Sequence, residues 1–254
     1  MKNLFLFLFL LVVFTSKAQD NRVSGLNSRQ FTKYWKVESE SPDYKVTFQG
    51  DTAEIVSPKG LTLWRKEKMS GKVTIEYDAC VVVESDGDRL SDLNCFWMAS
   101  DPQYPDNLWK REKWRSGIFL NCYSLQLYYL GYGGNHNSTT RFRRYDGDES
   151  GITNPKARPA ILKEYTDAGH LLKPNHWYHI KITNENNRVS YYIDGERLVD
   201  FRDAEPLREG WFGFRTTLSR TRITNFSYEC SSQEAAAVPL QWIGETPRQD
   251  LSLI

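Results

Sequence analysis

The sequence predicts an all-β protein, a sandwich of two antiparallel sheets of the jelly-roll type. Short apolar or alternating segments recur between polar turns, no long segment has a helical period, and aromatic residues make up 14% of the 254 residues. Many short strands at close spacing are typical of sandwiches. Turns between successive strands make the neighbours antiparallel, and aromatic rings fill sheet cores.

The first half of the chain supplies seven of the expected strands. Gly50-Asp51 is a strong turn pair and predicts a hairpin between the segments that flank it. Val73–Val83 alternates and then becomes wholly apolar, as expected of a central strand. The strands expected in this half are Tyr44–Gln49, Thr52–Val56, Leu61–Trp64, Val73–Val83, Asn94–Ala99, Gly117–Cys122 and Leu125–Leu130.

The second half adds two hairpins, one across residues 184–187 and one at the tight turn Asp194-Gly195. Its expected strands are Trp177–Thr183, Val189–Ile193, Arg197–Phe201, Trp211–Thr216 and Arg222–Tyr228. Between the halves, residues 133–172 are polar and rich in glycine, asparagine and threonine. A long connection on a sheet scaffold is often functional, so this region is a candidate site.

The N-terminus predicts export. Lys2 precedes an apolar run, Leu4–Phe14, that is too short to span a bilayer, and Ser16-Lys17-Ala18 fits a signal-peptide cleavage site. The alternative is an uncleaved anchor. No cysteine follows the run to accept a lipid, so the expected location is periplasmic or secreted. We therefore expect a signal peptide at 1–18, a sandwich domain at 19–231 and a C-terminal tail at 232–254, with no membrane span.

Charge and cysteine content restrict the partners. Removing Lys2 and Lys17 with the signal peptide leaves 31 of the 33 basic residues against 32 acidic ones, a balance that argues against nucleic acid. The cysteines show no metal-ligand spacing, which argues against zinc. They can form one or two disulfides in an oxidising compartment or can be buried as small apolar residues. These residues are Cys80, Cys95, Cys122 and Cys230.

The order of the motifs resembles a known superfamily. A tryptophan-containing strand (Asn94–Asp101) precedes paired tyrosines, an arginine-containing loop, the His176–Ile180 strand, the Tyr192–Glu196 hairpin and Trp211–Arg215. Over roughly residues 31–229 this resembles the concanavalin A-like lectin/glucanase superfamily. It is most similar to YesU-like and related secreted proteins of bacterial polysaccharide-utilisation loci. The resemblance implies a jelly roll acting on carbohydrate, notably uronate-rich glycans. It does not choose between hydrolase, lyase and lectin. No cofactor is expected, although several relatives hold a structural calcium ion.

The densest polar cluster, residues 128–146, predicts a site that reads acidic sugars. An arginine fork matches a carboxylate with two hydrogen bonds. Cleavage of a uronate by β-elimination needs a neutraliser, a base and an acid. The catalytic candidates are His136, Tyr145, Arg141 and Asn94, with Arg143 and Arg215 binding substrate. If Phe214 faces the core, alternation directs Arg215 to the outer sheet surface. A basic edge strand that discourages sheet pairing would also explain the cluster.

Two other functions stay open. A hydrolase needs two carboxylates about 5–10 Å apart, and Glu164 with Asp167 is the most suggestive pair. A non-catalytic sugar-binding protein needs only aromatic platforms and hydrogen bonds. Its candidate platforms are Trp97, Trp109, Trp114, Tyr128 and Tyr129. The expected partner in each case is a polysaccharide or oligosaccharide, and the sequence does not indicate an oligomeric state.

Overall fold

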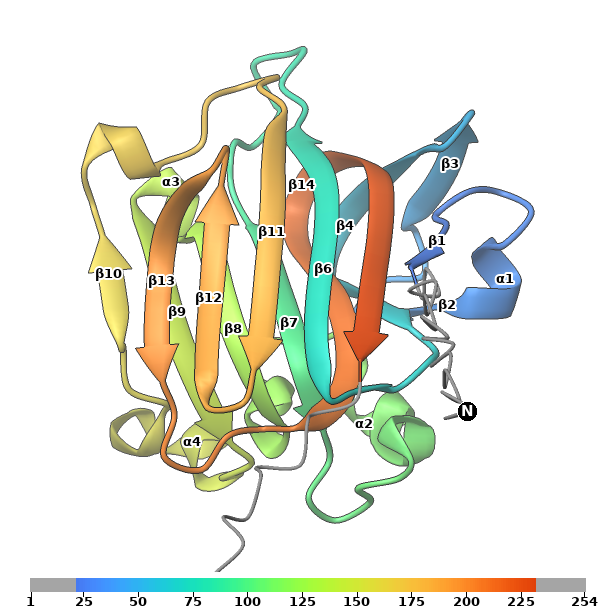
Figure 1. Ribbon diagram of the computed structural model, residues 1–254. Coiled ribbons are helices and arrows are strands. Elements are labelled where there is room, and N and C mark those ends of the chain that lie inside the picture. The colour runs from blue at the N-terminus through green and yellow to red at the C-terminus, as the bar shows by residue number, and fades with distance from the viewer. Residues whose placement is uncertain (1–21, 232–254) are drawn as a thin grey trace, which may run out of the picture.

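The computed structural model describes residues 22–231, and the predictions for residues 1–18 and 232–254 lie outside them. Two layers of strands face each other (Figure 1), and all the strand pairings within residues 22–231 are antiparallel. The predicted all-β sandwich is therefore confirmed. One layer, here called the back layer, contains β10 (Lys163–Tyr165), β9 (Thr139–Asp146), β8 (Gln126–Gly133), β7 (Leu93–Ser100) and β2 (Trp35–Ser39).

The front layer contains the other strands with a clear place in one sheet. It is built from β13 (Glu196–Arg202), β12 (Arg188–Ile193), β11 (Tyr178–Glu185), β6 (Lys72–Val81) and β3 (Lys45–Gln49). Two long strands, β4 (Thr52–Arg65) and β14 (Glu209–Ser231), run through both layers. Short β1 (Val23–Ser24) and β5 (Met69–Ser70) pair with β14.

The main core fills the space between the layers. Trp97 and Phe142 from the back layer meet Tyr191 from the front layer, with ring centroids 6.0 and 6.1 Å from Trp97. Phe214 belongs to the same core. Because neighbouring residues of a strand point to opposite faces, the residues that flank these on each strand must point outward. The outward side chains of the back layer build the site described below.

A second, smaller core lies on the outer face of the back layer. Its members include Trp64, Phe96, Leu127, Tyr145 and Trp211. The segment 101–124 covers them with three short helical turns: η1 (Leu108–Arg111), α2 (Glu112–Arg115) and η2 (Leu120–Ser124). The expected strand Gly117–Cys122 is therefore wrong. Phe119, Leu120 and Cys122 of this segment pack into the second core as part of the cover, whose edge reaches the candidate site.

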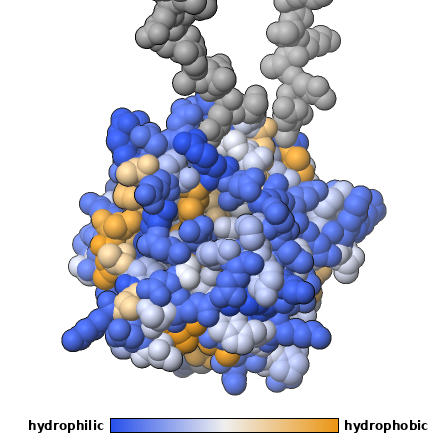
Figure 2. Space-filling model, turned by 90° about the horizontal axis from the view of Figure 1, so that it is seen from below, coloured by the Kyte–Doolittle hydropathy of each residue, from blue (hydrophilic) through white to orange (hydrophobic). Residues whose placement is uncertain are grey.

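The other short helices lie in loops. Residues 133–172, which the sequence suggests to be one long connection, contain the strands β9 and β10 and several of these short helices. These helices are α1 (Phe31–Tyr34), α3 (Gly134–Asn137), α4 (Ser150–Thr153), η3 (Pro155–Ala157) and η4 (Ala168–His170). No helix within residues 22–231 is long and apolar enough to cross a membrane. The face at the lower end of the layers is mostly hydrophilic, with apolar residues in small separate patches (Figure 2).

All four cysteines are free, so the disulfide alternative is not realised and the buried alternative describes three of them. Burial raises the pKa of the Cys95 thiol to about 12 and that of Cys122 to about 11. Both therefore stay protonated and unreactive at neutral pH.

Candidate functional site

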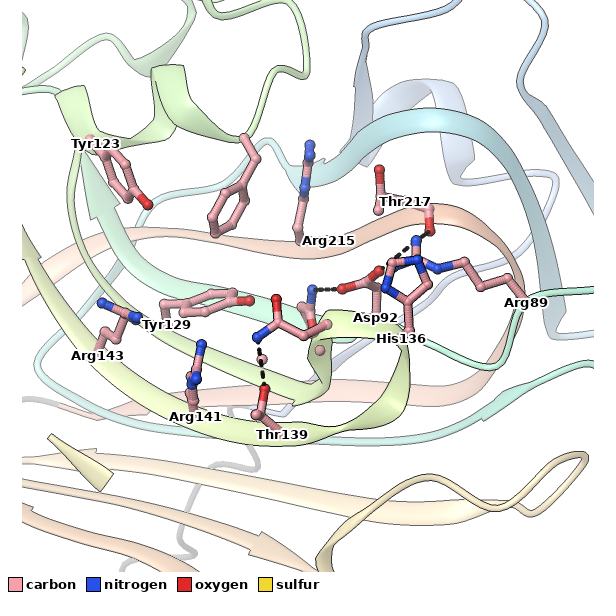
Figure 3. Close-up of a pocket in the computed structure, with 15 residues that line it drawn as sticks. Arg89, Asp92, Tyr123, Tyr129, His136, Thr139, Arg141, Arg143, Arg215 and Thr217 are labelled. Atoms are coloured by element: carbon pink, nitrogen blue, oxygen red, sulfur yellow. Dashed lines mark hydrogen bonds and ion pairs between the residues drawn. The ribbon is translucent and has the colours of Figure 1, made fainter. Parts of the chain in front are cut away.

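A pocket of about 310 Å³ opens on the outer face of the back layer (Figure 3). Six of the residues that the sequence predicts for the site line it: Asn94, Tyr129, His136, Arg141, Arg143 and Arg215. They come from the consecutive elements β8, α3 and β9 and from β7 and β14, which are distant from each other in the sequence. Phe214 lies in the main core, so alternation places Arg215 on the outer face as expected.

Strand register explains why these side chains meet. Arg141 on β9 pairs with Gly131 on β8, Gly131 pairs with Asn94 on β7, and Asn94 pairs with Arg215 on β14. Paired residues of adjacent strands point to the same face about 5 Å apart. The four residues therefore form one row across the sheet, with Glu164 of β10 beyond Arg141.

Gly131 gives this row its hollow. A Cβ atom at Gly131 would lie only 2.2 Å from the hydroxyl oxygen of Tyr129, so the tyrosine ring occupies the space that a side chain would fill. The ring packs against Phe96, Phe119 and Tyr145, with centroids 5.5, 5.6 and 5.8 Å away. Burial, with the charge of Asp92 second, raises the pKa of the Tyr129 phenol well above its usual range. At neutral pH Tyr129 is therefore a hydrogen-bond donor on the pocket floor.

The pocket is strongly positive. Four arginines line it, and Asp92 is the one acidic residue among its lining. Arg89 pairs with Asp92 at 3.0 Å and Arg141 pairs with Glu164 at 2.5 Å. Within residues 22–231, Arg143 and Arg215 form no salt bridge, although the charge of Arg215 acts on the carboxylate of Glu38.

The two unpaired arginines are nevertheless fixed in place. Arg143 donates to the carbonyl oxygen of Pro159. Arg215, which is 3% exposed, donates to the carbonyl oxygen of Gly117 at 2.5 Å. Each guanidinium has five N–H donors, so both keep donors for a ligand. Figure 3 shows Arg141 and Arg143 on one side of the pocket and Arg215 on the other, with the ring of Tyr129 between them.

His136 lies on an unusual turn at one end of the pocket. Asn135, His136 and Asn137 have φ angles of 51°, 58° and 58°, which is the left-handed region that costs residues other than glycine about 1–2 kcal/mol each. Such strain persists only where the surroundings hold it. Here Asn137 exchanges two hydrogen bonds with the backbone of Leu172, at 2.8 and 2.9 Å, and Ser91 donates to the carbonyl oxygen of Gly133 at 2.9 Å. The imidazole of His136 is exposed.

Three predicted site residues are placed where they cannot touch a ligand in this structure. Tyr145 shares a face with Arg141 and Arg143, but the cover formed by residues 101–124 buries it completely. Trp97 and Tyr128 point to the other face and are buried in the main core, where Tyr128 donates to Asp203 at 2.6 Å. Their assignment to catalysis or sugar binding is corrected for this reason.

Four other candidates lie outside the pocket lining. Trp109 packs edge-on against Trp211, with centroids 6.1 Å apart, and Trp114 is exposed beneath Arg111. Glu164 pairs with Arg141, and Asp167 accepts from His170 at 2.7 Å. The two carboxylates are thus each engaged with a different cation and do not face a common cavity.

The sequence did not point to several residues that line the pocket. These are Arg89, Asp92, Phe119 and Tyr123, whereas the other lining residues lie in the predicted cluster 128–146 (Gly131, Gly134, Asn135 and Thr139) or on the face predicted for Arg215 (Thr217). Asp92 is held by Arg89, by Ser91 at 3.0 Å and by Asn94 at 3.2 Å, so it orients Asn94 rather than standing free. Alternation from Arg215 predicts that Thr217 lies on the same face. The isolated charged residues of the 84–92 loop, in contrast, show no pattern that marks Arg89 or Asp92 as site residues.

Within the part of the chain that the structure describes, there is no group of three or more His, Cys, Asp or Glu side chains that could hold a metal ion. The residues present therefore do not form a carboxylate-rich site for the calcium ion that the resemblance suggested. The reaction proposed for this site uses the protein's own side chains.

Comparison with known proteins gives the family and the fold. The chain belongs to the family described as a domain of unknown function, DUF6250, whose model matches residues 55–226. A search of the curated proteins finds no match. A protein of unknown function with a galectin-like fold from Bacillus subtilis has a TM-score of 0.65 and 16% identity, over 84% of this chain and 96% of that one.

Two further solved structures have the same architecture. The carbohydrate-binding module CBM66 from Bacillus subtilis has a TM-score of 0.51 and 16% identity, over 77% of this chain and 94% of that one. The exoplasmic/lumenal domain of VIP36, in a form bound to Ca²⁺ and Man3GlcNAc, has a TM-score of 0.56 and 8% identity, over 85% and 91%. At these identities the likeness shows the fold, a lectin-like jelly roll. The expected similarity to YesU-like proteins stays a prediction.

Proposed function

We propose that this protein binds an acidic, uronate-containing saccharide in the outer-face pocket and cleaves it by β-elimination. The observation that carries the proposal is the excess of fixed positive charge: among the described residues, Arg143 and Arg215 line the pocket without a salt bridge of their own. A guanidinium that lacks a protein carboxylate in a partly buried site is matched by a ligand carboxylate. The carbohydrate-binding titles of two neighbours are compatible with a sugar ligand.

The pocket supplies the three groups that β-elimination needs. Arg143 and Arg215 neutralise the uronate carboxylate, which makes the proton on the adjacent carbon more acidic. His136 accepts that proton as its C–H bond breaks, and the electron pair forms the new carbon–carbon double bond. The bond from the next carbon to the glycosidic oxygen breaks, and Tyr129 protonates the leaving oxygen. Tyr129 takes the role predicted for Tyr145 because its hydroxyl lies on the pocket floor and its raised pKa keeps it protonated.

Asn94 and Arg141 are expected to act as supporting groups. Asn94 is held by Asp92 in the centre of the row between the arginines, where its amide can contact a carboxylate or hydroxyl. Arg141 shares its charge with Glu164, so it contributes less to neutralisation than the two unpaired arginines. Export through the predicted signal peptide would place this activity where polysaccharide is found.

The hydrolase alternative has less support. It requires two carboxylates flanking the scissile bond, whereas Asp92 is the one carboxylate in the pocket lining and three donors hold it. Non-catalytic sugar binding is the second candidate. The observation that favours it is His136, for which no hydrogen bond orients the imidazole within the described residues. A catalytic base is usually oriented by a third group.

The first test is incubation of the mature protein with a panel of oligo- and polyuronates. Ultraviolet absorbance would detect the conjugated unsaturated uronate that elimination forms, and a reducing-end assay would detect any cleavage. A rise in both supports the lyase. New reducing ends without the chromophore would overturn it in favour of hydrolysis. Neither signal, with retarded migration in a glycan-containing gel, would make the protein a binding module.

Two variants separate binding from chemistry. Arg143→Gln should weaken binding by about ten- to a hundredfold, because it removes one charged hydrogen-bond partner of the ligand. His136→Gln should keep binding and lower the turnover rate by about 10²–10⁴, the usual contribution of a general base. Arg222→Gln is the matched control, since Arg222 of β14 pairs with Glu54 of β4 and does not line the pocket. Equal behaviour of Arg143→Gln and Arg222→Gln would refute the assignment of the site.

A further inference from the structure

A strap of residues, 167–172, lies behind the His136 turn. The carbonyl oxygen of His170 accepts from the hydroxyl of Thr140 at 2.6 Å, and Thr140 in turn accepts from the backbone N–H of Gly133 at 3.2 Å. The backbone of Leu172 exchanges two hydrogen bonds with the side-chain amide of Asn137. The strap thus holds both ends of the strained turn that presents His136 to the pocket.

The side chain of His170 ties this strap to the edge of the front layer. Its Nδ1 atom lies 2.7 and 2.8 Å from the two carboxylate oxygens of Asp167, and its Nε2 atom lies 3.2 Å from Oε1 of Glu196 on β13. The ring stacks on Tyr165 with centroids 4.1 Å apart, and Tyr165 donates to the carbonyl oxygen of Leu198 at 2.7 Å. The imidazole is only 21% exposed.

Both ring nitrogens of His170 therefore face a carboxylate. A neutral imidazole has one N–H and one lone pair, so it can donate to only one of the two carboxylates. Its lone pair would then face the other carboxylate and repel it. Only the doubly protonated imidazolium satisfies Asp167 and Glu196 together.

We propose that His170 is a positioning residue for the His136 turn, which it holds in place when its imidazole carries both protons and releases when it loses one. The inference deepens the proposed function, on which its catalytic consequence rests. The link between His170 and the turn stands independently of that function, because it follows from the contacts of the strap.

The direction of the pH effect follows from the charges around His170. Burial lowers the pKa of His170, but the hydrogen bonds and charges of Asp167 and Glu196 outweigh it and raise the pKa from its usual value. A raised pKa means that the contribution is present at low pH and is lost as the pH rises through the folded-state value. Other ionisable groups near the imidazole come from β10, β8, β11, the β12–β13 turn and the 171–177 loop: Lys163, Tyr165, Tyr132, Tyr178, Asp194, Lys173 and His176.

Hydrogen exchange tests the link without any ligand. The amides of Gly133, Ser138 and Leu172 report the turn, because each donates a hydrogen bond within it or to it. Their protection, corrected for intrinsic rates, should fall about two- to fivefold as the pH rises, the range expected for a partly exposed ion pair. The measurements are made about one unit below and two units above the free imidazole pKa of about 6.5.

Three variants make the test specific. His170→Gln cannot carry the charge, so its turn should be poorly protected at both pH values. Glu196→Gln offers an amide that accepts from, or donates to, the second ring nitrogen, so its turn should stay protected at both. His179→Gln is the control, because His179 forms a similar exposed pair with Asp78 at 2.7 Å in the front layer. It should behave like the wild type.

The outcomes separate this inference from the proposed function. Wild-type protection that does not change with pH, or His170→Gln protection equal to that of the wild type, would overturn the role of His170 whatever the enzyme does. If the exchange results are as expected and uronates are cleaved, His170→Gln should lower the turnover rate at the acid end of the pH profile and leave the alkaline end unchanged. If no uronate binds, the proposed function fails while the exchange result still decides the link.

Discussion

Replacing Gly131 with alanine should block the candidate pocket from its floor. The new methyl group would lie 2.2 Å from the hydroxyl oxygen of Tyr129 and 2.7 Å from Cζ, where non-bonded carbon atoms need about 3.5 Å or more. The Tyr129 ring cannot move freely because Phe96, Phe119 and Tyr145 pack around it. We therefore expect the ring to be displaced into the pocket.

The size of the effect can be worked out from two opposing contributions. Inserting a methyl group into a packed site costs about 1–3 kcal/mol, and replacing glycine by alanine in a strand returns roughly 0.5–1 kcal/mol. The net loss of about 0–2.5 kcal/mol corresponds to a fall in Tm of up to about 10 °C for a chain of this size. Binding of an oligouronate should fall at least about tenfold, because the displaced ring occupies the ligand's place.

The assay is thermal unfolding followed by circular dichroism, with binding measured by calorimetry on the same samples. Gly134→Ala is the matched control. Gly134 lines the same pocket, but a Cβ there would lie 3.7 Å from its nearest neighbours, which is ordinary contact. Unchanged Tm and unchanged binding in Gly131→Ala would refute the geometry of the floor. A lower Tm with unchanged binding would separate the packing argument from the binding site.

Three further substitutions test other parts of the structure. Tyr145→Phe should leave stability and cleavage intact, because the hydroxyl of Tyr145 is buried without a hydrogen-bond partner, and lost activity would restore it as a catalytic candidate. Leu218→Asn should raise Tm by about 1–4 °C, because Leu218 is 54% exposed and has a φ of 49°, a backbone conformation that asparagine tolerates better than leucine. An unchanged or lower Tm would show that the backbone at this position is not strained. Glu38→Gln should lower Tm by more than about 4 °C, since it removes the nearer carboxylate of the fully buried Arg115, at 2.9 Å, and leaves it only Asp101 at 3.8 Å. A shift of a degree or two would contradict that role.

Sequence patterns predicted the fold and much of the site because both depend on local periodicity. Alternation is a property of each strand alone, so the outward direction of Arg215 follows once Phe214 is assigned to the core. The segment 128–146 is recognisable as a candidate site from its high content of glycine and arginine. Six predicted residues therefore line one pocket.

The part of the site that the sequence did not predict depends on how the strands pair with one another. The row from Arg141 to Arg215 requires the register of three strand pairs, and β7 and β14 each contain a register shift that no local pattern reveals. The catalytic role predicted for Tyr145 was corrected for a different reason. It shares the face of Arg143, but segment 101–124 covers that end of the sheet, and part of that segment has the pattern of a strand.

The cover formed by residues 101–124 and the candidate pocket are in direct contact and depend on each other. Without residues 101–124, the outer face of the back layer would expose the second core to water. Two buried ion pairs anchor the cover: Arg115 with Glu38 at 2.9 Å, and Arg111 with Asp101 at 2.7 Å.

The cover meets the pocket at Phe119, which packs on Tyr129 and lies 5.6 Å from the guanidinium of Arg215. Arg215 in turn donates to the carbonyl oxygen of Gly117 within the same cover. Arg215, one of the two pocket arginines without a salt bridge, is thus fixed by the segment that covers the neighbouring core. A substitution that loosens the cover should therefore weaken anion binding even when it lies far from the ligand. A lysine at position 215 would keep the charge but lose the fork that contacts the cover and the ligand together.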